Sequence, residues 1–120
     1  MASRILLVDD DSEIVSLVQY ALESMGHQVQ VCDNGREVLA TIQAYKPELL
    51  ILDVMLPGID GYSLANQISE DPAAKDTPII VLSALEPSRT MFQKFPQVAA
   101  FITKPFNTDD LMEAVRSALT

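Results

Sequence analysis

Short apolar runs alternate along the chain with stretches in which apolar residues recur every three or four positions. The short runs are typical of β-strands, and the wider spacing is typical of helices that bury one face. Because strands that alternate with helices form βαβ units, the pattern predicts an α/β fold with helices on both faces of a parallel sheet. The strand-like segments are residues 4–9, 28–32, 48–53, 78–83 and 98–103.

Five helices are expected between and after these strands. Asp11 and Ser12 can cap the start of the first helix, and Gly26 is placed to end it. The fourth helix, within residues 86–97, is short because Pro96 must stop it. The others are marked by apolar residues at helical spacing: Val38, Leu39 and Ile42 before Pro47; Leu64, Ala65 and Ile68; and Leu111, Met112, Val115 and Leu119 after a start at Asn107 or Thr108.

Length, composition and charge limit the function classes. The 120 residues suffice for one core, so we expect a single domain over residues 1–120. The chain starts without the apolar stretch of a signal peptide, and no run approaches the roughly 20 apolar residues that cross a bilayer. A cytoplasmic protein without membrane contact is therefore expected. Acidic residues outnumber basic ones by 17 to 8, for a net charge of −9, which excludes the basic surface that direct nucleic acid binding needs.

Polar residues stand at the ends of four of the predicted strands. The carboxyl ends of parallel strands meet at one edge of a sheet, which is where open α/β sheets bind ligands. We therefore expect these residues to form a site, and this explains why a buried strand should end on a carboxylate. In chain order they are Asp9 with Asp10, Asp53, Ser83, and Lys104 with Pro105.

The expected acidic cluster predicts a metal and a chemistry. Two carboxylates about 4 Å apart repel by roughly 4 kcal/mol at an effective dielectric near 20, which a divalent cation would relieve. Oxygen ligands without histidine or thiolate favour Mg²⁺, or Mn²⁺, over zinc, and Mg²⁺ usually also takes a phosphate oxygen. In such a site Asp53 can attack phosphorus, while Lys104 and Ser83 can stabilise phosphoryl oxygens. A cis bond before Pro105 would aim the lysine.

The segments VDDDSE, LDVMLPGIDGY, VLSA and FITKPF resemble, in this order and over essentially the whole chain, the receiver domain of two-component response regulators. The resemblance implies a flavodoxin-like doubly wound sheet with strand order 2-1-3-4-5. It also implies roles for the site residues: phosphoacceptor Asp53; metal ligands Asp9, Asp10, Asp53 and the backbone carbonyl of Met55; phosphoryl-stabilising Ser83 and Lys104; switch residues Ser83 and Phe101; and lysine-orienting Pro105.

The function implied by the resemblance is a signalling switch, with no turnover of an external substrate. A histidine kinase or histidine phosphotransfer protein would donate a phosphoryl group to Asp53 in a Mg²⁺-dependent reaction. The added charge would then shift the face around the fourth helix and fifth strand toward another partner. The output domain or protein is not predicted by the sequence. Met55 and Leu85 are bulky and apolar, so we expect slow loss of the phosphoryl group.

Three other functions use the same architecture or similar residues. A flavodoxin-like electron carrier is disfavoured because the acids of DDDSE would repel a bound phosphate. A haloacid-dehalogenase-type phosphatase needs a second acid where this chain has Met55. A pseudo-receiver that binds partners without phosphorylation is disfavoured because all five key positions are filled, but the degenerate fourth helix leaves this alternative open.

Several residues have ordinary structural explanations. Asp11 is expected to cap a helix and Asp60 to stabilise a turn. Cys32 is expected to be a half-buried strand thiol, and His27 a surface residue. Phe101 suits a core aromatic as well as a switch residue.

Overall fold

The computed structural model describes residues 3–54, 61–83 and 95–119. Its strands are β1 (Arg4–Val8), β2 (Gln28–Cys32), β3 (Leu49–Asp53), β4 (Ile79–Ser83) and β5 (Val98–Thr103). Its helices are α1 (Ser12–Ser24), the 3-10 helix η1 (Gly35–Glu37), α2 (Val38–Tyr45), α3 (Gly61–Glu70) and α5 (Thr108–Ala118).

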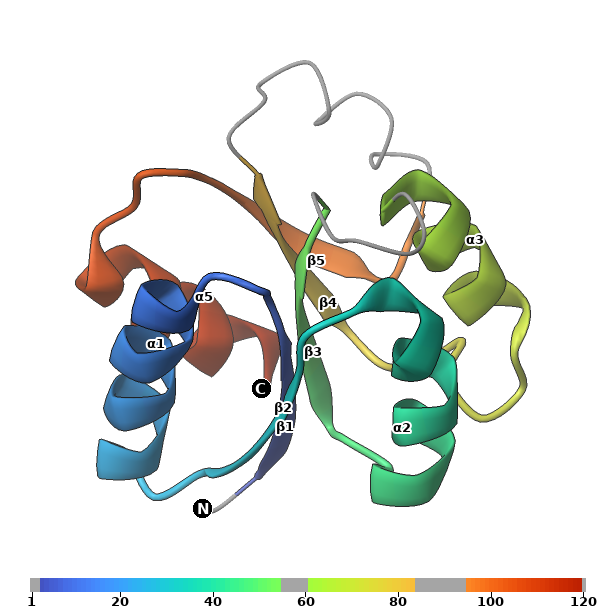
Figure 1. Ribbon diagram of the computed structural model, residues 1–120, viewed down its shortest axis with the longest axis horizontal. Helices are drawn as coiled ribbons and strands as arrows, with labels where there is room; N and C mark the ends of the chain where they lie inside the picture. Colours follow the sequence, from blue (N-terminus) through green and yellow to red (C-terminus); the bar gives the residue numbers. More distant parts are fainter. Residues whose placement is uncertain (1–2, 55–60, 84–94, 120) are drawn as a thin grey trace.

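The strands form one parallel sheet in the order β2-β1-β3-β4-β5. This confirms the predicted doubly wound sheet, and each predicted strand lies within one residue of its observed bounds. Figure 1 shows α1 and α5 on one face of the sheet, with α2 and α3 on the other. The central strands are therefore covered on both faces.

The covered strands are the continuously apolar ones, because both of their faces meet helices. In β1, Leu6 packs into the core on the side of α2 and α3, whereas Ile5 and Leu7 pack on the side of α1 and α5. Every residue of β3 and β4 is buried. Burial of one such side chain contributes about 1.5–3 kcal/mol, so these strands hold their carboxyl ends firmly in place.

The predicted helix caps are present. The carboxylate of Asp11 accepts hydrogen bonds from two backbone N–H groups in the first turn of α1, at 3.0 and 3.3 Å. Gly26 follows the helix with φ of 92°, a conformation that glycine adopts at little cost. The side-chain oxygen of Asn107 accepts from the first turn of α5 at 2.7 Å. These contacts explain where α1 and α5 begin.

The end of α2 is tied to the sheet by an arginine. The helix stops at Lys46, which has φ of 54° and precedes Pro47. From β1, the Nε and Nη2 atoms of Arg4 donate to the backbone oxygen of Lys46 at 3.0 and 2.8 Å. Since the last carbonyls of a helix lack partners within it, Arg4 supplies one of the missing donors.

The expected fourth helix lies largely outside the described residues. Among those the structure describes, the α-helices are α1, α2, α3 and α5, and residues 86–94 of the segment expected to form the fourth helix are not described. None of the described helices is long and apolar enough to cross a membrane.

Two expected exposures were wrong. Cys32 is buried rather than half-buried, because the end of β2 belongs to the core on the α2 side of the sheet. His27 is half-buried rather than fully at the surface, and its Nδ1 accepts a hydrogen bond from the backbone N–H of Ser3 at 3.3 Å.

Candidate functional site

Four strands bring polar residues to one edge of the sheet. Asp9 directly follows β1, Asp53 is the last residue of β3, Ser83 is the last of β4, and Lys104 directly follows β5. The strand register aligns these ends, because Val8 lies beside Leu52 and Asp53 lies beside Leu82 in the next strand. The backbone N–H of Lys104 also donates to the carbonyl of Ser83 at 2.8 Å. The site predicted from the strand ends is therefore assembled.

Lys104 bridges two of the acids. Its Nζ donates to Oδ2 of Asp9 at 3.0 Å and to Oδ2 of Asp53 at 3.2 Å. The Asp9 and Asp53 side chains are almost fully buried, with 0% and 4% of their surface exposed, whereas that of Lys104 keeps 17%. The ammonium group therefore neutralises charge where water is scarce.

The start of α1 fixes the orientation of Asp9. Its Oδ1 accepts a hydrogen bond from the backbone N–H of Asp11 at 2.9 Å, while its Oδ2 contacts Lys104. Asp11 is also the residue that caps α1 through its side chain. The sequence predicts the cap but not the backbone contact, whose only signal is that Asp9 lies two residues before the cap. Both oxygens of Asp9 are thus held.

The pKa values of the bridged groups reflect burial and mutual attraction. Burial raises the pKa of Asp9, and the nearby charge of Asp53 raises it further. The hydrogen bonds from the Asp11 N–H and from Lys104 lower this pKa, but the net direction is upward. Burial would lower the pKa of Lys104, but its contacts with Asp9 and Asp53 together outweigh burial and raise that pKa. The lysine is therefore firmly cationic, and Asp9 gains from any further positive charge nearby.

Three carboxylates could hold a cation. One oxygen from each of Asp9, Asp10 and Asp53 lies within 4.8 Å of the others, with Asp10 exposed and the other two buried. Among the described side chains, the ammonium of Lys104 contacts two of these acids, Asp9 and Asp53. The donors are all carboxylate oxygens, which suits a hard divalent cation such as Mg²⁺ or Mn²⁺. The residues present therefore fit the predicted metal.

Ser83 and Phe101 lie on neighbouring strands. Ser83 is fully buried, and Phe101 is half-buried against the core on the side of α2 and α3. Phe101 pairs in register with Val81, two residues before Ser83. Because side chains two residues apart in a strand share a face, Ser83 and Phe101 lie on the same side of the sheet.

The peptide bond between Lys104 and Pro105 is cis, as the sequence analysis suggested. Met55, Asp60 and Leu85 lie outside the described residues.

Comparisons with known proteins agree with this arrangement. The family model described as "Response regulator receiver domain" matches residues 5–116. The chain is 35% identical over 117 residues to the "DNA-binding dual master transcriptional regulator RpaA" of Synechocystis sp., a match that covers 97% of this chain and 48% of that protein. The chain spans about half the length of the first curated relatives it matches.

Two solved structures show the same architecture. A putative response regulator from Chloroflexus aurantiacus J-10-fl superposes with a TM-score of 0.91 at 30% identity, over 99% of this chain and 98% of that one. The response regulator protein TrrA from Thermotoga maritima, in complex with Mg(2+)-BeF, superposes with a TM-score of 0.85 at 33% identity, over 98% and 99% of the two chains.

Proposed function

The chain belongs to the response regulator receiver domain family, and we propose that it works as a phosphorylation switch in which Asp53 accepts the phosphoryl group. The observation that carries this proposal is the contact of Lys104 with both Asp53 and Asp9, beside a third carboxylate. Two buried carboxylates held by one lysine are an expensive arrangement for structure alone, because the buried charges of Asp9 and Asp53 lose their hydration. They suit a site that receives a charged group.

The residues that would hold Mg²⁺, with Mn²⁺ as the alternative, are Asp9, Asp10, Asp53 and the backbone carbonyl of Met55. A bound divalent cation would supply positive charge for phosphoryl oxygens. The TrrA structure is described as a complex with Mg(2+)-BeF, which supports the same ligand class here. Asp9 is oriented for this role by the Asp11 N–H and Lys104.

The proposed reaction is attack by a carboxylate oxygen of Asp53 on the phosphorus of a phosphohistidine. A phosphorus–oxygen bond forms, the phosphorus–nitrogen bond breaks, and the donor histidine leaves with the electron pair. Lys104 already contacts Asp53 at 3.2 Å, so its ammonium group can stabilise the developing negative charge without a large movement. Ser83, at the end of the neighbouring strand, would donate its hydroxyl to a phosphoryl oxygen.

The switch would follow from the charge added to Asp53. A phosphoryl group brings about two negative charges and several acceptor oxygens. Ser83 would move toward those oxygens, and Phe101, on the same side of the sheet, would repack into the space behind it. The face formed by β5 and the segment before it would then favour a different partner through a population shift.

The proposed partners are a histidine kinase or histidine phosphotransfer protein and a separate output domain or protein. Several relatives are transcriptional regulators of about twice this length. The net charge of −9 argues that any DNA binding in such a protein belongs to another domain. We propose that the chain does not turn over an external substrate.

The test is modification of the chain by acetyl phosphate or phosphoramidate, followed by intact mass. With Mg²⁺ present, the wild-type chain should gain one phosphoryl adduct, and chelator added before the phosphodonor should prevent its formation. Asp53→Asn should gain none, whereas the matched control Asp76→Asn, at an exposed position before β4, should behave as wild type. A folded wild-type chain without an adduct would favour the pseudo-receiver instead.

A further inference from the structure

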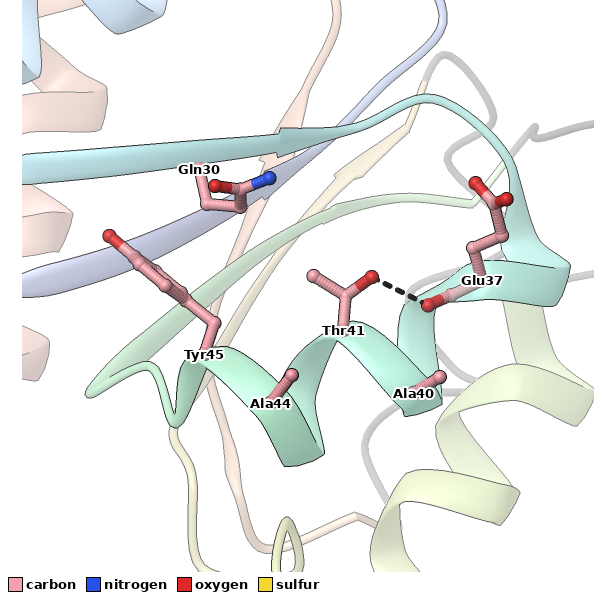
Figure 2. A pocket seen from close by; sticks show the side chains of 6 residues that line it. All are labelled: Gln30, Glu37, Ala40, Thr41, Ala44 and Tyr45. Atoms are coloured by element: carbon pink, nitrogen blue, oxygen red, sulfur yellow. Dashed lines mark hydrogen bonds between the residues drawn. The ribbon is translucent and has the colours of Figure 1, made fainter.

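A groove away from the acidic site lies between β2 and α2. It has a volume of about 580 Å³ and is lined by Gln30, Glu37, Ala40, Thr41, Ala44 and Tyr45. Figure 2 shows Gln30 on β2 across from the small side chains of α2. The groove exists because the methyl groups of Ala40 and Ala44 leave space between the helix and the strand.

The strand beside this groove has a free edge. Among the described residues, β2 pairs with β1 alone and without a register shift. The N–H of Gln28 and the C=O of Cys32 bond toward β1. Because the main chain of a strand turns to alternate sides, the N–H and C=O groups of Val29 and Val31 face the free edge. In natural edge strands, a charge, a proline or a bulge commonly prevents pairing with another chain. The sequence QVQVC contains neither charge nor proline.

We propose that two copies of this chain associate through their β2 strands, antiparallel, about a two-fold axis at Gln30. The strand sequence reads almost alike in both directions, so this axis places Val29 opposite the partner's Val31. Those valines would exchange both of their backbone hydrogen bonds. Gln30 would lie opposite itself in a closely spaced pair, where the two side-chain amides can hydrogen-bond to each other.

Charges beside the strand favour the antiparallel orientation. Arg4 pairs in register with Gln28, at the start of β2, and contacts the backbone of Lys46 and the side chain of Glu48. Two basic groups and one acid therefore stand at that end. The other end carries Asp33, Arg36 and Glu37, two acids and one basic group. Antiparallel pairing of the two β2 strands places the acidic end of each copy against the basic end of the other. Parallel pairing would place like charges together.

The test is sedimentation of the intact chain over a concentration series. Each copy carries a net charge of −9, so the two repel each other. Salt at about 0.15 M screens this repulsion beyond a distance of about 8 Å. The wild type should move from monomer to dimer as concentration rises. Gln30→Lys and Gln30→Glu each place like charges on the two-fold axis, so either alone should weaken association by about fivefold. An equimolar mixture of the two should restore association as a heterodimer.

Further variants test whether association depends on the free edge of β2 rather than on another surface or on loss of the fold. Gln30 is exposed, so Gln30→Thr should keep the fold and associate within about threefold of wild type. Glu37→Lys and Lys46→Glu should each weaken the dimer, and the double variant should recover it. Asp53→Asn should associate as the wild type does, which makes the result independent of the proposed phosphorylation.

Three results would overturn the proposal. The first is a wild-type chain that stays monomeric up to about 1 mM, where even a weak complex of about −4 kcal/mol is half formed. The second is a dimer that is unaffected by Gln30→Lys. The third is a mixture of the Lys and Glu variants that remains monomeric although each is folded by circular dichroism.

Discussion

The Nζ of Lys104 lies 3.0 Å from Oδ2 of Asp9, although the two residues are 95 positions apart in sequence. Lys104 follows β5 and Asp9 follows β1, and β3 and β4 stand between these strands. The lysine reaches Asp9 past Asp53, which it contacts on the way. The contact therefore requires β1, β3, β4 and β5 in register, so the site forms only when these four strands have paired.

Replacing Lys104 should show how much its contacts with the two buried acids contribute to the free energy of unfolding. We expect Lys104→Met to lower the free energy of unfolding by about 3 kcal/mol in metal-free buffer, because Asp9 and Asp53 stay buried without their partner. Urea unfolding with chelator measures this loss. The exposed Lys75 gives a control, since Lys75→Met should change stability by less than about 0.5 kcal/mol. Equal effects of the two variants would mean that the bridge contributes nothing.

Divalent metal should stabilise the folded chain through the acidic cluster. At Mg²⁺ concentrations about 100 times its dissociation constant, the free energy of unfolding should rise by about 2.7 kcal/mol. Asp10→Asn is the informative variant, because Asp10 is exposed and its substitution leaves the buried bridge intact. Thermal unfolding with and without Mg²⁺ should show a smaller metal-induced shift in this variant. A shift as large as in the wild type would place the metal elsewhere.

Asp11 should matter for stability more than for chemistry. Its side chain caps α1, so Asp11→Ala should cost about 1 kcal/mol, while Asp11→Ser should keep most of the cap. Its backbone N–H, which holds Asp9, is present in both variants. Both should therefore still gain the phosphoryl adduct in the intact-mass assay. Loss of the adduct from a folded Asp11→Ala protein would assign the side chain a direct role.

The lifetime of the adduct gives a prediction that rests on sequence alone. Met55 is apolar and bulky, and we expect it to slow the approach of water to the phosphorylated Asp53. Met55→Asn should shorten the lifetime several-fold, which a time course of intact mass after removal of the donor would follow. An unchanged rate would show that this position does not control access.

The sequence predicted the sheet well because its signals are local. Strand bounds follow from runs of apolar residues, and the edge that carries Asp9, Asp53, Ser83 and Lys104 follows from where those runs end. The caps at Asp11 and Asn107 were also predictable, because they depend on only the next few residues.

What the sequence could not predict depends on how elements pack together. The bridge from Lys104 to both acids needs distances that no spacing along the chain defines. The alternation around Cys32 suggested a half-buried thiol, but residues from other elements cover that end of β2. The groove beside Gln30 likewise depends on how far α2 lies from the strand.

Asp53 lies at the end of a strand whose backbone should fluctuate little. β3 lies between β1 and β4, and all of its residues are buried. Amides in such a strand exchange with solvent hydrogen mainly when the whole domain opens, whereas amides near exposed ends exchange through small local openings. We therefore expect the amides of β3 to be among the slowest to exchange in the described part of the chain, so that the surroundings of Asp53 can rearrange while its own backbone stays in place.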